Sequence, residues 1–216
     1  MKDAPLKAIK HEIQSLLSGK GQVCQGTLIQ TISRYLRTSS PTGSMAQASQ
    51  QNKRKEAERL TKYAEEQGLW VKDIRFSNFI SAGAEQRVFI KDSYHLIKLN
   101  DTVYYASWLD YFQSLLLNNF FFPDTAYRFL GFYLQDNVLH AVVEQPFVVA
   151  NKPTDLPMVK LFMGNNSFEN TRNHDYYHPV LGIILEDLHD ENVLTQNSIL
   201  FFIDTVFYIR PEVLWT

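Results

Sequence analysis

The sequence has little of what membrane, secreted and nucleic-acid-binding proteins need. It contains one cysteine, Cys24, so an internal disulfide framework is excluded and a reducing compartment is expected. The formal net charge is −2, which gives no general basic field for a nucleic acid or an anionic membrane. Apolar runs are too short to span a membrane, and charges near the N-terminus argue against a secretory signal. We therefore expect a soluble, cytoplasmic protein with no membrane partner and no specific nucleic-acid signal.

The composition is that of a globular protein. The chain has 216 residues, of which 45% are hydrophobic and 13% aromatic, enough for the core of one or two domains. Residues 1–70 are expected to form an N-terminal helical region and residues 71–216 a second domain. The helical spacing of Leu6, Ile9 and Ile13 favours a first helix that stops at Gly19.

Two more helices are expected in the N-terminal region. A second amphipathic segment spans 28–36, and the Ser/Pro/Gly composition of residues 39–44 is typical of a flexible connector. Residues 46–67 are rich in strong helix formers, and Gly68 ends this segment. Its charges of both signs are interleaved over 53–59, which favours a solvated helix face over a nucleic-acid-binding surface.

The pattern changes to that of strands from Trp70 onwards. A hairpin is expected over 88–99, a helix over 108–116, and a second hairpin around the turn Asp136-Asn137. A short helix over 156–163, an apolar segment over 182–185 and a polar loop over 187–192 follow. A last strand over 200–203 ends at Asp204. The fold class expected is α+β.

Four residues in this second region suit phosphoryl transfer. Asp187 and Asn192 stand five positions apart in one loop, and Asp204 ends the next strand. Such a reaction needs carboxylate and amide oxygens for Mg²⁺ and a carboxylate near the attacking hydroxyl. Lys98, on an earlier strand, can act as a point charge for phosphates.

The loop Asp187-Leu188-His189-Asp190-Glu191-Asn192 is similar to the catalytic loops of protein kinases and, more closely, of aminoglycoside and choline kinases. Residues from about 75 to 208 resemble the kinase domain of polyvalent proteins, which are encoded by phages and conjugative elements. Four further segments match that family in order: Trp108 to Phe112, Asn119 to Pro123, Gly131-Phe132 and Glu144 to Phe147. The resemblance implies a minimal protein-kinase-like fold, with an antiparallel-sheet upper lobe carrying one helix, a reduced lower lobe and extra N-terminal helices.

The resemblance also implies ATP and Mg²⁺ as cofactors and a role for each matching residue. Asp187 would orient or deprotonate the acceptor hydroxyl, and Asn192 and Asp204 would bind magnesium. Lys98 would hold the α- and β-phosphates beneath Gly83, the glycine of a shortened phosphate-binding loop. The remaining implied nucleotide-binding residues are an acid that positions Lys98 and two backbone groups facing adenine: Asp110, the Gln145 C=O and the Phe147 N–H.

The sequence departs from the kinase pattern in ways that leave alternatives open. Glu186 replaces the Arg or Gly expected before the catalytic aspartate, and only about a dozen residues follow Asp204, so no acceptor-binding platform is expected. The first interpretation is an ATP- and Mg²⁺-dependent phosphotransferase acting on Ser, Thr, Tyr or a small-molecule hydroxyl. The alternatives are a catalytically weak, pseudokinase-like interaction module of a mobile genetic element, and a helical adaptor.

Individual residues have simpler interpretations too. Asp187 and Asn192 suit a turn between strands, and Lys98 and Asp110 suit exposed positions. His189 is expected to brace its loop, and His174 and His178 to lie at the surface. Because the apolar segments 183–185 and 200–203 need cover, we expect the helices at 5–18 and 26–37 to pack against the lower lobe.

Overall fold

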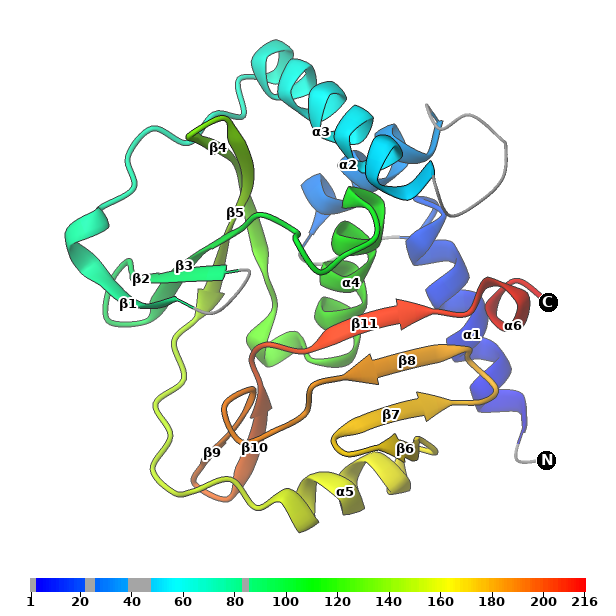
Figure 1. The fold of residues 1–216 in the computed structure, drawn as a ribbon. Coiled ribbons are helices and arrows are strands. Elements are labelled where there is room, and N and C mark those ends of the chain that lie inside the picture. Colours follow the sequence, from blue (N-terminus) through cyan, green and yellow to red (C-terminus); the bar gives the residue numbers. More distant parts are fainter. Residues whose placement is uncertain (1–2, 22–25, 39–47, 83–85) are drawn as a thin grey trace. The chain divides into compact units, whose positions relative to one another are not determined.

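The structure is a computed structural model that describes residues 3–21, 26–38, 48–82 and 86–216. The chain divides into two compact units, each with its own helices and sheet (Figure 1). Unit 1 comprises Met1–Val23, Gln113–Thr125 and Val148–Thr216, and unit 2 comprises Cys24–Phe112 and Ala126–Phe147. The helices and antiparallel strands confirm the expected α+β class. In the described parts of the chain, no helix combines the length and apolar character that a membrane span requires.

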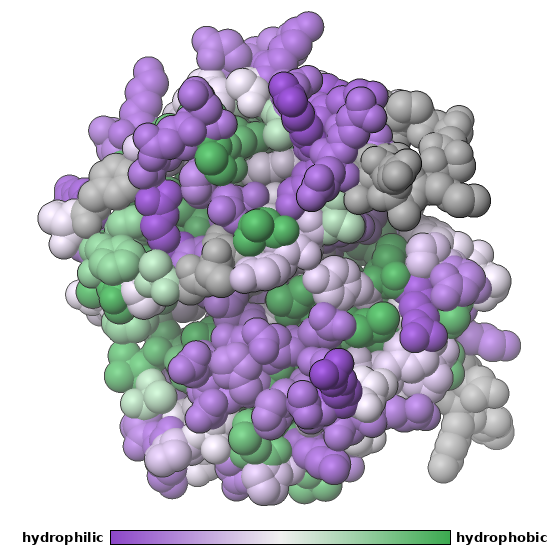
Figure 2. Space-filling model, in the orientation of Figure 1, coloured by the Kyte–Doolittle hydropathy of each residue, from purple (hydrophilic) through white to green (hydrophobic). Residues whose placement is uncertain are grey.

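Unit 2 is built on a five-stranded sheet in the order β1-β2-β3-β5-β4, with every neighbouring pair antiparallel. The strands are β1 (Phe79–Ala82), β2 (Gln86–Ile90), β3 (His95–Asn100), β4 (Arg128–Gln135) and β5 (Val138–Pro146). Both expected hairpins are therefore confirmed. Asp136 and Asn137 have φ values of 50° and 63°, the left-handed pair that a two-residue hairpin turn requires. Figure 2 shows apolar residues at the surface over β1 and β2, where Phe79 and Ile80 are exposed.

Aromatic packing identifies the two faces of this sheet. Helix α4 (Trp108–Phe121) begins in unit 2, and its Phe112 ring lies 5.4 Å from Phe129 and 6.2 Å from Phe132. Phe89, Leu99 and Val142 form a buried cluster on the opposite face. The sheet is thus covered by α4 on one side and closed by the segment before β1 on the other.

A close backbone contact joins that segment to β4. Val71 N–H donates to the Phe132 carbonyl at 2.9 Å, and Phe132 N–H donates to the Leu69 carbonyl at 2.8 Å. Gly131 has a φ of 148°, and a Cβ at this position would lie 2.2 Å from the Leu69 oxygen. Only glycine fits here, which explains the Gly-Phe pair noted in the sequence.

Unit 2 also contains α2 (Thr27–Thr38) and α3 (Ala48–Gln67). The Tyr35 and Tyr63 rings lie 4.5 Å apart, and the Arg59 guanidinium donates to the Tyr35 and Leu36 carbonyls. The expectation that this second helix packs on the lower lobe is wrong, because α2 belongs to the unit of the five-stranded sheet. The connector expected at 39–44 lies outside the described residues, as does Cys24.

Unit 1 has a four-stranded antiparallel sheet and a separate hairpin. The sheet order is β11-β8-β7-β6, and β9 pairs with β10. These strands are β6 (Glu169–Arg172), β7 (Asp175–His178), β8 (Ile183–Glu186), β9 (Val193–Gln196), β10 (Ile199–Phe202) and β11 (Val206–Ile209). The second half of α4 belongs to this unit, where Phe121 stacks on Phe207 with ring centroids 5.6 Å apart.

Three other helices complete unit 1: α1 (Asp3–Leu17), α5 (Leu156–Asn165) and α6 (Pro211–Leu214). The expected helix over 156–163 is confirmed as α5, capped by Asp155, whose side chain accepts from Met158 N–H. Ile13 of α1 is fully buried, and the Gln14 amide donates to the Leu214 carbonyl at 2.6 Å. The first N-terminal helix therefore packs within the same unit as the 187–192 loop, as expected. Both units draw on residues before and after position 70, so independent folding of residues 1–70 and 71–216 stays a prediction.

Candidate active site

The loop over 187–192 begins where β8 ends, and its backbone is held by the neighbouring strand hairpin. Asp187 has a φ of 69°, a left-handed conformation that aspartate tolerates better than most residues. Its N–H donates to Asp175 Oδ1 at 3.1 Å, and Leu188 N–H donates to the His174 carbonyl at 3.2 Å. Leu188 is fully buried and anchors the loop, while the Asp187 carboxylate stays exposed.

The side chains of this loop form a closed set of contacts. The Asn192 amide nitrogen donates to the Asp187 carbonyl at 2.9 Å and to Asp187 Oδ2 at 2.8 Å. His189 Nδ1 accepts from Glu191 N–H at 3.1 Å. Its Nε2 lies 3.2 Å from the Asn192 amide nitrogen and 3.2 Å from Asp187 Oδ1. His189 and Asn192 thus orient the two carboxylate oxygens of Asp187, and the Asn192 side-chain oxygen is the atom suited to a cation.

Asp204 is brought to this loop by the β9–β10 hairpin. Val193 pairs with Phe202, and Ile203 N–H donates to the Asn192 carbonyl at 2.9 Å. The next residue along the chain is Asp204. Thr205, directly after it, donates its hydroxyl to Asn118 Oδ1 of α4 at 2.9 Å, and both residues are buried. The backbone on either side of Asp204 is therefore fixed.

The donor set fits a hard cation. An amide oxygen of Asn192 and the carboxylate of Asp204 are ligand types that Mg²⁺ prefers. Within the described residues no group of three or more His, Cys, Asp or Glu side chains could hold a metal alone. Mg²⁺ commonly keeps several waters and takes one or two protein carboxylates together with substrate phosphates, so a small protein set suffices.

The charges around the loop are acidic. Burial raises the pKa of Glu186 above its usual value, and the negative charges of Asp175 and Asp187 raise it further. This residue replaces the arginine or glycine noted above. Because the local potential is negative, a bound cation would be stabilised here.

Lys98 lies in unit 2, on the α4-covered face of the sheet. It pairs with Val88 and Val143 along the ladders of β3, and Val143 in turn pairs with Phe129 of β4, so these side chains lie on one face. Lys98 is 3% exposed, and its Nζ lies 5.6 Å from the centre of the Tyr127 ring. A nearly buried lysine held by a cation–π contact is not the exposed strand lysine of the simpler interpretation.

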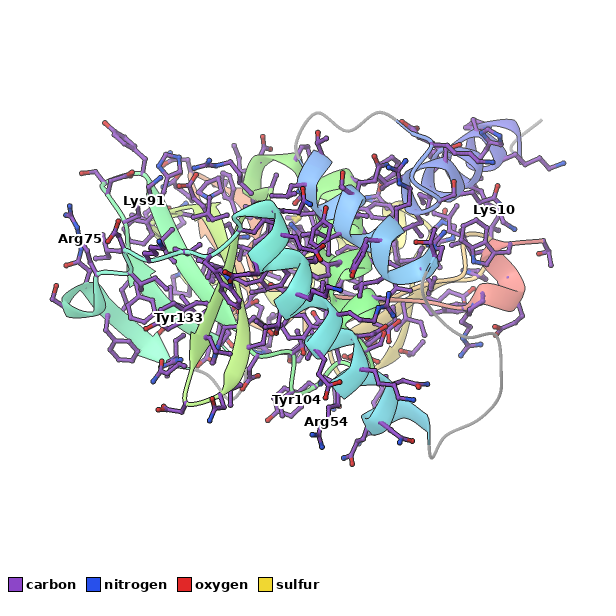
Figure 3. All side chains as sticks on the ribbon, turned by 90° about the horizontal axis from the view of Figure 1, so that it is seen from above. Lys10, Arg54, Arg75, Lys91, Tyr104 and Tyr133 are labelled. Atoms are coloured by element: carbon purple, nitrogen blue, oxygen red, sulfur yellow. The ribbon has the colours of Figure 1, made fainter. Side chains whose placement is uncertain are left out.

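The opposite face of the sheet carries a hollow of about 340 Å³. Its lining includes Ile97 and Val142, together with Arg75 and Lys91, which Figure 3 labels. Lys98 points to the other face because side chains alternate along a strand. This hollow is therefore not part of the candidate active site.

Asp110 has contacts other than those expected. Ser107 Oγ accepts from Asp110 N–H at 3.0 Å, and the Asp110 carboxyl bonds back to Ser107, which is a capping box at the start of α4. Burial raises the pKa of Asp110, while Ser107 and the charge of Lys53 lower it. The described contacts thus give Asp110 a capping role, and the charge of Lys53 also acts on it. A role for Asp110 in positioning Lys98 stays a prediction.

The connector over 144–147 also differs from expectation. Phe147 N–H donates to the Tyr94 carbonyl at 2.7 Å, so the donor expected to face adenine already has a partner. Gln145 is buried and pairs with Leu96, and a role for its carbonyl in adenine recognition stays a prediction. Glu144 accepts from both Lys91 and Arg128. Gly83 lies outside the described residues.

The sequence did not indicate the buried contacts of two charged residues of α3. Glu56 is buried and accepts from Trp108 N–H at 2.8 Å, and Lys53 donates to the Thr102 and Tyr105 carbonyls. Figure 3 labels Arg54 and Tyr104, which are the sequence neighbours of Lys53 and Tyr105. The solvated-face interpretation fits Arg54, which pairs with Glu58 on the surface, but not Lys53 or Glu56. When acidic and basic residues alternate along a helix, the sequence does not indicate which of these side chains are buried.

His178 is also corrected: it is 1% exposed, not at the surface. It lies on β7, where it alternates with Tyr177 and shares a face with the buried Tyr176. This period of two is the signal that could have indicated its burial.

An α+β chain with an aspartate–asparagine loop, followed by a hairpin and a second aspartate, has the features expected of a kinase-like phosphotransferase. Residues 53–211 match the family described as the Serine/Threonine/Tyrosine kinase found in polyvalent proteins, and the chain belongs to this family. The match includes most of α3 and begins at Lys53, earlier than the sequence suggested. No curated protein and no solved structure gave a significant match.

Proposed function

We propose that this protein is an ATP- and Mg²⁺-dependent phosphotransferase whose acceptor is a hydroxyl group, of Ser, Thr or Tyr in a protein or of a small molecule. Membership of the kinase family supports phosphoryl transfer in general. The observation that carries the proposal is the contact set of Asp187, His189 and Asn192, which orients an exposed carboxylate and leaves an amide oxygen for a cation.

The roles follow from this chemistry. Asp187 accepts or orients the proton of the acceptor hydroxyl. Asn192 and Asp204 hold the magnesium ion, which neutralises phosphate charge when bound. Lys98 supplies a positive charge to the phosphates, and Gly83 and the Gln145 carbonyl remain proposed nucleotide contacts. Phosphoryl transfer depends mainly on positioning and charge, which are what these residues would supply.

Transfer of the γ-phosphate is the direct test. The purified chain is incubated with labelled ATP and Mg²⁺, and label in protein, added hydroxyl compounds and free phosphate is counted. We expect turnover that EDTA abolishes and that Asp187→Asn lowers by about 10²- to 10⁴-fold. The matched control is Asp190→Asn, three residues along the same loop, which should leave turnover unchanged. Equal turnover in wild type and Asp187→Asn would remove the catalytic role of Asp187.

Thermal melting tests the metal assignment separately. Ligand bound only by the folded state stabilises it, by about 2.7 kcal/mol at a hundredfold excess over Kd. We expect Mg·ATP to raise the melting temperature of the wild type, and Asp204→Ala to lose the magnesium-dependent part of this rise. Identical responses of the two proteins would show that Asp204 does not bind the metal.

A further inference from the structure

The chain changes from one sheet to another at Asp204, the proposed magnesium ligand. The ladder of β10 with β9 ends at Phe202, and the ladder of β11 with β8 begins at Val206. Residues 203–205 lie between these two ladders. The ladders therefore do not set the position of Asp204, and contacts from other elements decide where its carboxylate lies.

Two polar residues of α4 bind the chain just after Asp204. Asn118 Oδ1 accepts from the Thr205 hydroxyl at 2.9 Å. Ser114 Oγ accepts from Phe207 N–H at 3.0 Å. Four residues along a helix rise about 6 Å, and two residues along a strand rise about 6.6 Å. The spacing of positions 114 and 118 on the helix therefore matches that of positions 205 and 207 on the extended chain.

The chain just before Asp204 is bound as well. Thr125, at the end of the short 3-10 helix that follows α4, donates its hydroxyl to the Phe202 carbonyl. Ile203 N–H donates to the Asn192 carbonyl at 2.9 Å, which ties this segment to the 187–192 loop. Hydrogen bonds therefore hold the backbone on both sides of Asp204, and most of them come from side chains of α4 and the turn after it.

The side chains that make these contacts are buried in apolar surroundings. None is more than 5% exposed, and the set is Ser114, Asn118, Thr125 and Thr205. Leu115 to Leu117, between the two polar positions of α4, are buried too. Replacing both partners of a buried hydrogen bond by apolar groups of the same shape is often nearly neutral, so stability alone does not account for this polar set. What these bonds add is a fixed direction for the backbone that they hold.

We propose that Asn118 and Thr205 are positioning residues of the phosphotransferase. Their hydrogen bond holds the Asp204 carboxylate where it and the Asn192 amide oxygen can bind one magnesium ion. The other two bonds from α4 and its following turn hold the ends of the same segment. This inference rests on the proposed function, because it takes Asp204 as a metal ligand. Loss of the bond leaves the carboxylate in place but less well oriented, so the cost falls on magnesium affinity.

Thr205→Val tests the inference in the full chain, since valine has the shape of threonine but no hydroxyl. Turnover is measured at a fixed, low ATP concentration while free Mg²⁺ is varied above it. We expect the Mg²⁺ concentration at half-maximal turnover, the Mg²⁺ midpoint, to rise about five- to tenfold, the worth of one hydrogen bond. Turnover at saturating Mg²⁺ should fall much less. A purely structural role would instead lower the amount of active protein, and hence the maximal turnover, without changing the Mg²⁺ midpoint.

Two variants serve as matched controls. Thr205→Ser keeps the hydroxyl and loses a buried methyl group, so it should keep the wild-type Mg²⁺ midpoint even where it lowers stability. Thr195→Val removes the hydroxyl of another buried threonine of unit 1, one that has no hydrogen-bond partner within the described residues, and should leave the midpoint unchanged. If Thr205→Val does not fold, Thr125→Val and Thr125→Ser give the same comparison on the other side of Asp204.

Hydrogen exchange of the segment 203–207 adds a measurement that needs neither nucleotide nor metal. Exchange should be faster in Thr205→Val than in Thr205→Ser. Equal Mg²⁺ midpoints of these two variants, or equal exchange of the segment in both, would overturn the positioning role. A wild type without Mg²⁺-dependent turnover would contradict the proposed function instead, and the exchange comparison would still decide whether the hydroxyl holds the segment.

Discussion

His189 is the residue whose role the geometry defines most sharply. Its Nδ1 accepts a backbone N–H and its Nε2 faces Asp187, so both ring nitrogens are engaged within the loop. A general base would need one nitrogen free for the acceptor proton. The contacts therefore favour the bracing role that the sequence suggested.

This assignment predicts different effects of two substitutions. His189→Ala removes the contacts of the ring with the Asp187 carboxylate and with the Asn192 amide, and should lower turnover about ten- to a hundredfold by freeing Asp187. His189→Gln keeps a donor near Nε2 and should restore most of the rate with an unchanged pH profile. Steady-state turnover between pH 6 and 9 decides the matter. If His189→Gln is as inactive as His189→Ala, His189 does more than brace Asp187.

Glu144 gives a second prediction at this scale. Burial alone would raise its pKa, but ion pairs with Lys91 and Arg128 outweigh burial and hold the pKa below its usual value. A lowered pKa means that the ionised form stabilises the fold above the unfolded-state pKa near 4.3, and that this contribution is lost as pH falls through the folded-state value.

Glu144→Gln should therefore cost about 1–3 kcal/mol at pH 7 and progressively less below about pH 4. Urea denaturation at the two pH values measures the difference. Glu58→Gln is the control, since Glu58 forms an exposed pair with Arg54 and should change stability little at either pH. A Glu144→Gln penalty that is the same at both pH values would contradict the ion-pair account.

At the scale of elements, substitution of two glycines by alanine is expected to have opposite effects on stability. Gly131 of β4 has a φ of 148° and approaches the Leu69 backbone, whereas Gly164 of α5 has open space around it. Gly131→Ala should cost about 1–3 kcal/mol from backbone strain alone, before the clash is counted. Gly164→Ala should instead stabilise by about 0.4–1 kcal/mol. Thermal melting of both variants checks this, and equal effects would show that the contact of β4 with residue 69 is not rigid.

The elements that could be predicted are those with a long or strongly marked pattern. The hairpins of β2–β3 and β4–β5 have apolar runs and a clear turn, and α1 and α3 end at glycines with positive φ nearby, Gly19 and Gly68. The missed strands are four residues long. Glu169–Arg172 of β6 is exposed at every position and has no alternation of apolar and polar residues to detect.

The candidate site also contains residues whose association could be predicted from the sequence and residues whose partners could not. Asp187, Asn192 and Asp204 lie close in sequence, and a loop and one hairpin bring them together, so their association could be predicted from spacing. The influence of Lys53 on Asp110 could not be predicted, because Lys53 comes from a helix more than fifty positions earlier. The hydrogen bond from Phe147 N–H to the Tyr94 carbonyl could not be predicted either, because it depends on how the turn at Tyr94 packs on the end of β5. Local patterns predict local sites, and tertiary partners need the structure.

At the scale of the whole molecule, each unit is formed by segments that are distant in the sequence, so no single boundary in the sequence separates the two units. Unit 1 contains α1 and all residues from Val148 onwards, while α2 and α3 belong to unit 2. Residues 71–216 alone would therefore lack a helix of unit 1 and two helices of unit 2. Each loss would uncover apolar side chains, among them Leu36 and Leu60, which are fully buried.

Deletion of residues 1–44 tests whether the chain is one cooperative structure. It removes α1 and α2, whose side chains Ile13, Ile29, Ile32 and Leu36 are fully buried. Burial of each such side chain is worth about 1.5–3 kcal/mol, and the total approaches or exceeds the stability of an average domain. We expect the deletion to give insoluble or unfolded protein, judged by circular dichroism and size-exclusion chromatography.

Point variants in the full chain keep this test informative, because a deletion can fail for unrelated reasons. Ile13→Ala should cost about 2–5 kcal/mol, and Glu12→Ala, its exposed neighbour on α1, should change stability by less than about 0.5 kcal/mol. Urea denaturation should show one transition in each case if α1 melts together with the rest of its unit. A soluble deletion protein that melts as the full chain does, together with a harmless Ile13→Ala, would show that residues 45–216 close their own core. The N-terminal helices would then be an addition to the kinase domain and not a part of its fold.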